Sequence, residues 1–239
     1  MTNRIFAERL EYAVGEVCKE IKRRKNIVNW HDMPEEQLWN ELVSCILGSQ
    51  VRHEHSQCII KYLISEGLLS IKYLIRNGEH FERNIQSALE KPIPSPLTKI
   101  GSVKYRYPRT KANYIRRTGD SIYSTNSSIG RILTSCIDER TARTRIMSVA
   151  VGIGPKQASL FLRNIGYAEN LAILDTHILK YMTVIGLVPQ ILKTVSYLPK
   201  YEDIEGILNN YAIKFEESLA YLDTAIWIVM RSCWKEAIV

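Results

Sequence analysis

The sequence predicts an all-α fold, and three features of the 239 residues carry that prediction. Apolar residues recur at three- and four-residue spacing through most of the long segments, which is the helical period. Strict alternation of apolar and polar residues, which would indicate strands, never lasts more than a few positions. Prolines, acidic residues and glycines fall where helices begin and end.

The first half of the chain divides into helices at these signals. Residues 4–25 carry apolar side chains on one side, and the connector 26–33 follows. Pro34 and the acidic residues after it suit the first turn of a second helix. One or two short helices over 56–76 and a helix over 81–89 complete this half. The run 91–96 holds three prolines, which are incompatible with a helix and favour extended backbone.

The second half shows the same pattern of apolar stripes ended by turn residues. Gly186 and Pro189 end one helix, because glycine and proline are typical of helix C-termini. The expected helices cover residues 110–123, 138–151, 155–165, 176–186, 201–213 and 216–234.

Composition bounds the class of protein. The net charge of +7 and a pI near 9.1 favour a polyanionic partner. No apolar run approaches the roughly 18–20 residues that a bilayer span needs, and the first residues lack a signal-peptide core. We therefore expect no membrane association and a cytoplasmic location, at the nucleoid if the source is a prokaryote.

Cysteine and histidine positions argue against a metal or a disulfide. The five cysteines stand at 18, 45, 58, 136 and 233 without paired spacing, so we expect reduced thiols and no iron–sulfur cluster. His53, Glu54 and His55 lack the helical i, i+4 pair with further ligands that a metal site requires. We expect neither a metal site nor a cofactor.

The most informative stretch is Gly152-Ile153-Gly154-Pro155-Lys156. Glycines one residue apart allow positive φ and a close approach to another molecule. Proline is favoured at the first helical position, so a helix begins at 155, and its free N–H groups form a ready phosphate site. With the helix before it, this segment forms a helix–hairpin–helix unit.

Lys156 and Asp175 are the candidate catalytic pair. The positive end of the helix dipole disfavours a charged ammonium at Lys156, and a nucleophilic lysine must be neutral. Asp175 follows an apolar run and begins the next helix, where an N-cap is the alternative role. A phosphate-binding surface lysine is the corresponding alternative for Lys156.

The pattern Gly-x-Gly-x-Lys with Asp about twenty residues later resembles the helix–hairpin–helix DNA glycosylase superfamily. Residues 152–178 are most similar to the type 2 8-oxoguanine DNA glycosylases. The resemblance implies two helical domains with the active-site cleft between them. One is continuous, over residues 35–170, and the other combines 1–34 with 171–239.

The resemblance also implies roles for residues outside the hairpin. Gln50, in the turn after the second helix, would fill the gap left by an extruded nucleotide, and Arg52 follows it; an ordinary polar turn is the alternative. Asp223 and Trp227 match an Asp-x-x-x-Trp pattern that lines the base pocket, although core packing is the plainer role for Trp227. We expect His177 to be a packing or hydrogen-bonding residue and not a base.

A basic segment lies between residues 91 and 119. It holds eight basic residues, no acidic one and interspersed tyrosines at 105, 107 and 114; the basic residues are Lys91, Lys99, Lys104, Arg106, Arg109, Lys111, Arg116 and Arg117. Solvation alone explains many charge runs, but this combination favours a nucleic-acid face. Arg109 and Lys111 belong to a helix start that resembles the type 2 enzymes, so we expect both to bind DNA together with Gly152 and Gly154.

The implied activity is a bifunctional DNA glycosylase and AP lyase that acts as a monomer on double-stranded DNA with a damaged or modified base. Lys156 would release the base, 8-oxoguanine by default, through a Schiff base, and β-elimination would nick the strand. The hairpin carbonyls could hold a monovalent cation. The end of the chain, from Arg231, departs from the family's tail. Two alternatives stay open: another modified or hypermodified base, as in phage DNA, and a non-catalytic DNA-binding protein.

Overall fold

The structure is a computed structural model that describes residues 2–24, 28–94, 101–189 and 193–236. Almost all of the regular secondary structure of its described residues is helical, which confirms the all-α prediction. The α-helices are α1 (Thr2–Arg24), α2 (Glu35–Gly48), α3 (His53–Ser65), α4 (Ile71–Arg76), α5 (Gly78–Glu90), α6 (Pro108–Tyr123), α7 (Ile129–Thr134), α8 (Glu139–Val149), α9 (Pro155–Asn164), α10 (Thr176–Val184), α11 (Leu198–Ala212) and α12 (Leu219–Glu236). None of the described helices is long and apolar enough to span a membrane.

Four small elements were absent from the sequence prediction. The strands β1 (Ile93–Pro94) and β2 (Ser102–Val103) pair antiparallel, with Ile93 opposite Val103. Two short 3₁₀-helices are η1 (Trp30–Asp32) and η2 (Ile213–Phe215). Elements of two or three residues are too short to show a period in the sequence.

The chain divides into two compact units. Unit 1 combines residues 1–28 with 166–239, and unit 2 is continuous over 29–165. The domain boundaries expected from the resemblance, at residues 34 and 170, stay a prediction.

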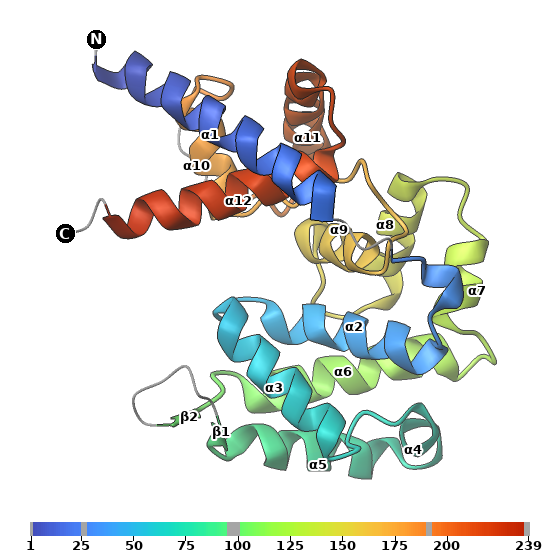
Figure 1. The fold of residues 1–239 in the computed structure, drawn as a ribbon. Helices are drawn as coiled ribbons and strands as arrows, with labels where there is room; N and C mark the ends of the chain where they lie inside the picture. The colour runs from blue at the N-terminus through green and yellow to red at the C-terminus, as the bar shows by residue number, and fades with distance from the viewer. Residues whose placement is uncertain (1, 25–27, 95–100, 190–192, 237–239) are drawn as a thin grey trace. The chain divides into compact units, whose positions relative to one another are not determined.

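Unit 1 is built on α1 and α12, which pack along each other, with α10 against α12 (Figure 1). Its core combines inward residues of α1, α10, α11 and α12, among them Val14, Leu179, Leu208 and Leu222. The non-helical segment 171–174 passes through this core and leads to the start of α10.

Unit 2 is organised around α2, which contacts α3, α6, α7 and α9 (Figure 1). Trp39 of α2 is fully buried, and its indole N–H donates to the Leu69 carbonyl at 2.9 Å. The helices α8 and α9 pack against each other and form the helix–hairpin–helix unit, so α2 supports the hairpin from its second helix.

The helix α7 was missed in the sequence, and a long-range contact explains it. Glu35 accepts hydrogen bonds from the backbone N–H of Ile129 at 2.7 Å and of Gly130 at 3.1 Å, and from the Tyr123 hydroxyl at 2.8 Å. A carboxylate at a helix N-terminus satisfies the free N–H groups there and interacts favourably with the positive end of the helix dipole. These bonds come from α2, far away in sequence, and add to the local N-cap, in which the Ser128 side chain accepts from the N–H of Arg131 at 3.1 Å.

Candidate active site and DNA-contacting turns

The hairpin between α8 and α9 has one obligatory glycine. Gly152 has φ +76°, and a Cβ there would lie 2.3 Å from Cδ2 of the Tyr114 ring, which is far below van der Waals contact. Gly154 instead has φ −102° and is the N-cap of α9, so the expectation of positive φ at both glycines is correct only for Gly152. A Cβ on Gly154 would meet nothing within 4 Å.

Lys156 is the second residue of α9, as the sequence predicted, and its side chain is half-buried. Its charge acts on Cys45 of α2. Burial, followed by the Glu41 carboxylate, raises the pKa of the Cys45 thiol well above its ordinary value, while the charge of Lys156 acts in the opposite direction. Glu41 also accepts a hydrogen bond from Asn164 at 2.7 Å. Nothing in the sequence indicates that Cys45 is within reach of the charge of this lysine, because it occupies an ordinary core position of a helix.

The turn between α2 and α3, residues 48–51, exposes Gln50 with φ +64°. A left-handed conformation is uncommon for a residue other than glycine and is a frequent mark of functional strain. Arg52, the N-cap residue of α3, is also exposed. Both residues are therefore accessible to a ligand, as the sequence prediction requires.

The sequence predicts that Lys111 binds DNA, whereas the structure places its side chain in the interior. Its side chain is 5% exposed, and its Nζ donates to the carbonyl of Ile46 at 2.7 Å. The buried Tyr105 hydroxyl donates in the same way to the Leu47 carbonyl at 2.8 Å. A direct DNA contact by Lys111 is therefore wrong for this structure. The ammonium instead pairs with a C-terminal carbonyl of α2, the negative end of that helix.

The remainder of the basic segment divides between surface and interior. Arg109, the second residue of α6, is exposed as predicted. Arg116 pairs with Glu82 at 2.8 Å and Asp120 at 2.7 Å, so its charge is compensated. Lys99 lies outside the described residues. The described part of this segment therefore does not form a continuous basic face, although several of its charged side chains are exposed.

The helix α6 contacts both turns that are expected to bind DNA, the Gln50 turn and the hairpin between α8 and α9. Lys111 bonds the end of α2 that leads into the Gln50 turn, and Tyr114 packs its ring against Gly152. The buried hydroxyl of Thr118 accepts a hydrogen bond from the N–H of Val151 at 2.9 Å. Because 111, 114 and 118 lie on one face of a helix, a single rigid element fixes both turns.

In unit 1, Asp175 is the N-cap of α10, the role that the sequence allowed. Its Oδ1 accepts hydrogen bonds from the N–H of His177 at 2.8 Å and of Ile178 at 3.0 Å. Among the described residues, no hydrogen bond to its Oδ2 is present. Asp175 is half-buried, and the helix fixes its Oδ1.

Asp223 and Trp227, predicted for the base pocket, both lie on α12. Asp223 is 3% exposed, and its Oδ2 accepts a hydrogen bond from the N–H of Ile173 at 2.9 Å. This contact gives Asp223 a structural role that the sequence did not reveal. Trp227 is half-buried against the core of unit 1, and the guanidinium of Arg231 lies 4.7 Å from the centre of its ring.

The described residues hold no group of three or more histidine, cysteine, aspartate or glutamate side chains that could bind a metal ion. The cysteines among them are free thiols. The polar groups available for chemistry in these elements are thus an amine, carboxylates and backbone N–H groups.

Comparison with known proteins places these elements in a family. The family model for 8-oxoguanine DNA glycosylase matches residues 19–217. The chain belongs to the 8-oxoguanine DNA glycosylase family. The 8-oxoguanine DNA glycosylase/AP lyase of Methanocaldococcus jannaschii is 30% identical over 225 residues, which are 93% of this chain and 95% of that protein. The enzyme of the same description from Saccharolobus islandicus is 36% identical over 131 residues, 54% of this chain and 60% of its own length.

Solved structures of this family have the same fold. The crystal structure of the M. jannaschii 8-oxoguanine DNA glycosylase covers 95% of this chain and 94% of its own, with a TM-score of 0.69 and 27% identity. A second structure, of an M. jannaschii glycosylase/lyase in complex with a 15mer DNA containing 8-oxoguanine, has a TM-score of 0.64, 25% identity, and coverage of 93% and 95%.

Proposed function

We propose that the protein is a bifunctional DNA glycosylase and AP lyase that removes 8-oxoguanine from double-stranded DNA and then nicks the strand. The relatives in its family are named for this pair of activities, and one neighbouring structure holds DNA with that base. The observation that carries the proposal is the half-buried Lys156 in the first turn of α9, directly after a hairpin whose glycines expose backbone.

Lys156 is the nucleophile of the proposed reaction. Since a stacked base hides its glycosidic bond, the nucleotide is first extruded from the duplex. The Nζ lone pair bonds to C1′, and the C1′–N9 bond breaks so that its electrons leave with the base. Loss of the amine proton and opening of the sugar at O4′ give a Schiff base. Removal of a C2′ proton then expels the 3′-phosphate, which cuts the strand.

Asp175 is the electrostatic partner in this proposal. Positive charge develops on the sugar as the base departs, and a fixed carboxylate stabilises that charge without reorganising. The capping bonds to Oδ1 hold the group still. The chemistry requires that Lys156 and Asp175 reach the same nucleotide, so the cleft between two domains stays part of the proposal.

Binding to DNA is assigned to the exposed turns. The N–H groups at Gly152 and Gly154 would hold a phosphate, with a monovalent cation on the hairpin carbonyls as a further element. Gln50 would fill the space of the extruded nucleotide, flanked by Arg52, and Arg109 would contact the backbone. Trp227 and Asp223 would line the base pocket, and the protein would act as a monomer in the cytoplasm.

The first prediction concerns Lys156. The variant Lys156→Gln loses base release and strand nicking by roughly 10⁴-fold or more, because the nucleophile is gone. Borohydride, which traps a Schiff base, no longer links protein to an 8-oxoguanine duplex. The matched control is Lys72→Gln, an exposed lysine of α4 in the same unit, and it behaves like the wild type. A trapped complex with Lys156→Gln contradicts the assignment.

An experiment on the wild-type protein distinguishes the two alternative functions, which are excision of a different modified base and DNA binding without catalysis. It is incubated with duplexes that each hold one modified base, and released base and strand nicks are recorded separately. Release of another oxidised or hypermodified base in preference to 8-oxoguanine changes the substrate but keeps the reaction. Tight binding without release from any duplex identifies a DNA-binding protein without catalysis.

A further inference from the structure

The segment 171–174 is non-helical, largely buried and outside any described sheet. It joins the end of α9 to α10, and Leu171, Ala172 and Leu174 in it are all at most 2% exposed. Backbone N–H and C=O groups in such a place need hydrogen-bond partners, because burial without them is unfavourable. No neighbouring strand supplies these partners, so side chains of unit 1 take that role.

Tyr201 of α11 bonds the segment twice. Its hydroxyl donates to the carbonyl of Ala172 at 2.7 Å and accepts from the N–H of Leu174 at 3.0 Å. The tyrosine is fully buried. One hydroxyl thus serves both a donor and an acceptor of the backbone immediately before Asp175.

Two buried carboxylates complete the set. The Oε1 of Glu205 accepts from the N–H of Ala172 at 2.8 Å, and the Oδ2 of Asp223 accepts from the N–H of Ile173 at 2.9 Å. Glu205 is 1% exposed and lies one turn after Tyr201 on the inner face of α11. A charged group on a core face is costly unless it is well bonded, which points to a specific function for this glutamate.

We infer that Tyr201 and Glu205 are positioning residues for Asp175. Three consecutive N–H groups of residues 172–174 are each held by a different side chain, and the next residue is the carboxylate that caps α10. The inference rests on the proposed function, in which the placement of Asp175 sets the rate. Small displacements of a catalytic group reduce rates strongly, so these contacts act on turnover and not on DNA affinity.

A double-mutant cycle tests the inference. In the wild-type background, Tyr201→Phe, which keeps the ring but removes the hydroxyl, lowers single-turnover release of 8-oxoguanine about 10-fold or more. The dissociation constant for the duplex stays unchanged. In an Asp175→Asn background the same change has little further effect, because the group that Tyr201 positions is already impaired. Equal losses in both backgrounds, or no loss in either, overturn the inference.

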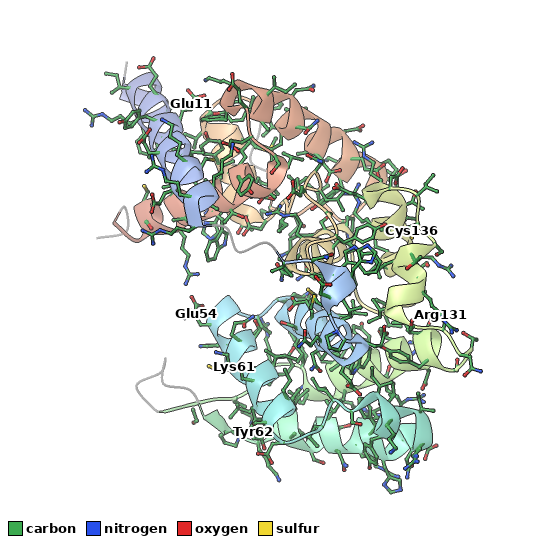
Figure 2. The ribbon with its side chains drawn as sticks, turned by 45° about the vertical axis from the view of Figure 1, so that its right-hand side comes forward. Glu11, Glu54, Lys61, Tyr62, Arg131 and Cys136 are labelled. Atoms are coloured by element: carbon green, nitrogen blue, oxygen red, sulfur yellow. The ribbon has the colours of Figure 1, made fainter. Side chains whose placement is uncertain are left out.

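A control on the same helix separates positioning from general stability. The Tyr211 hydroxyl donates at 2.8 Å to Glu11, which Figure 2 labels on α1, and it does not contact residues 171–174. Tyr211→Phe therefore removes a hydroxyl of α11 without slowing release. A loss of rate in Tyr211→Phe equal to that in Tyr201→Phe also overturns the inference.

Glu205 supplies a second, independent readout. Glu205→Gln keeps an oxygen that can accept from Ala172 and retains most of the rate, whereas Glu205→Leu does not. Hydrogen exchange of the amides of 172–174 is slow in the wild type and faster in Tyr201→Phe and Glu205→Leu. This exchange is measured without substrate, so it tests the contacts even if the wild type releases no base, the outcome that rejects the proposed function alone. Unchanged exchange in both variants overturns the inference.

Discussion

At the scale of single residues, Asp175 combines a structural and a proposed chemical role in one carboxylate. Two backbone N–H groups in the first turn of α10 donate to its Oδ1. The two roles need different things from the side chain. Capping needs an acceptor oxygen, and stabilising a developing cation needs a negative charge.

Substitutions that separate these needs give the second prediction. Asp175→Asn keeps an acceptor, so the free energy of unfolding changes by at most about 0.5 kcal/mol, while base release falls by about 10²–10³-fold. Asp175→Ala loses the cap as well and is destabilised by about 1 kcal/mol. Denaturant unfolding and single-turnover kinetics measure the two effects. Wild-type turnover in Asp175→Asn leaves capping as the only role.

At the scale of elements, the hairpin shows how two similar glycines differ. Gly152 is fixed by its positive φ and by the Tyr114 ring against it. Gly154 has an ordinary conformation and open space around it, so nothing in the described protein requires a glycine there. A ligand that approaches the backbone closely would supply that requirement.

The third prediction compares alanine at these two positions. Gly152→Ala is destabilised by about 1–2 kcal/mol from backbone strain alone, and the contact with Tyr114 adds to this cost. Gly154→Ala loses at most about 1 kcal/mol but binds duplex DNA about 10-fold more weakly, because its Cβ intrudes on the phosphate. Melting temperatures and fluorescence anisotropy measure both quantities. Unchanged DNA affinity in Gly154→Ala removes the hairpin backbone from the proposed interface.

Local signals predicted the parts of the site that depend on neighbouring residues. The start of α9 follows from Pro155, and the cap of α10 follows from Asp175 at the edge of an apolar run. The burial of Lys111 could not be read in the same way, because it depends on Ile46, which is distant in sequence. In sequence, a lysine in a basic segment looks the same whether it meets solvent or a helix end.

The contacts around Asp175 were beyond sequence analysis for the same reason. Glu205 occupies a core position of α11, where an acid breaks the apolar stripe formed by Tyr201, Ile204 and Leu208. That break is a visible signal, but it does not reveal the segment that the acid bonds. The fold class and most helices, in contrast, follow from periodicity and were predicted with no knowledge of packing.

At the scale of the whole molecule, the buried Lys111 links stability to pH. Burial lowers the pKa of its ammonium to about 8 from an ordinary value of 10.5. Between these values the unfolded chain binds more protons than the folded one, so the free energy of unfolding rises with pH. The stability that follows from deprotonation of Lys111 is fully present above the pKa of the unfolded chain, 10.5, and is lost as the pH falls through the folded pKa of about 8.

The fourth prediction isolates this contribution. Lys111→Met removes the titrating group while keeping a long side chain, so its unfolding free energy lacks the rise between pH 8 and 10.5. Tyrosines that titrate near the upper limit are present in both proteins and cancel in the difference. Denaturant unfolding at a series of pH values measures it. Parallel curves for the two proteins contradict the assignment of a buried, titrating lysine.

The single helix behind both turns has a consequence for how lesions would be found. Since α6 fixes the end of α2 and the hairpin together, one helix sets the spacing between the Gln50 turn and the hairpin. If both turns engage DNA as proposed, any duplex that does not match this spacing when straight must deform to fit, and the energetic cost depends on local stiffness. Base pairs that are already weakened would then be sampled first, so that flexibility of the double helix would select the site before any atom of the base is read.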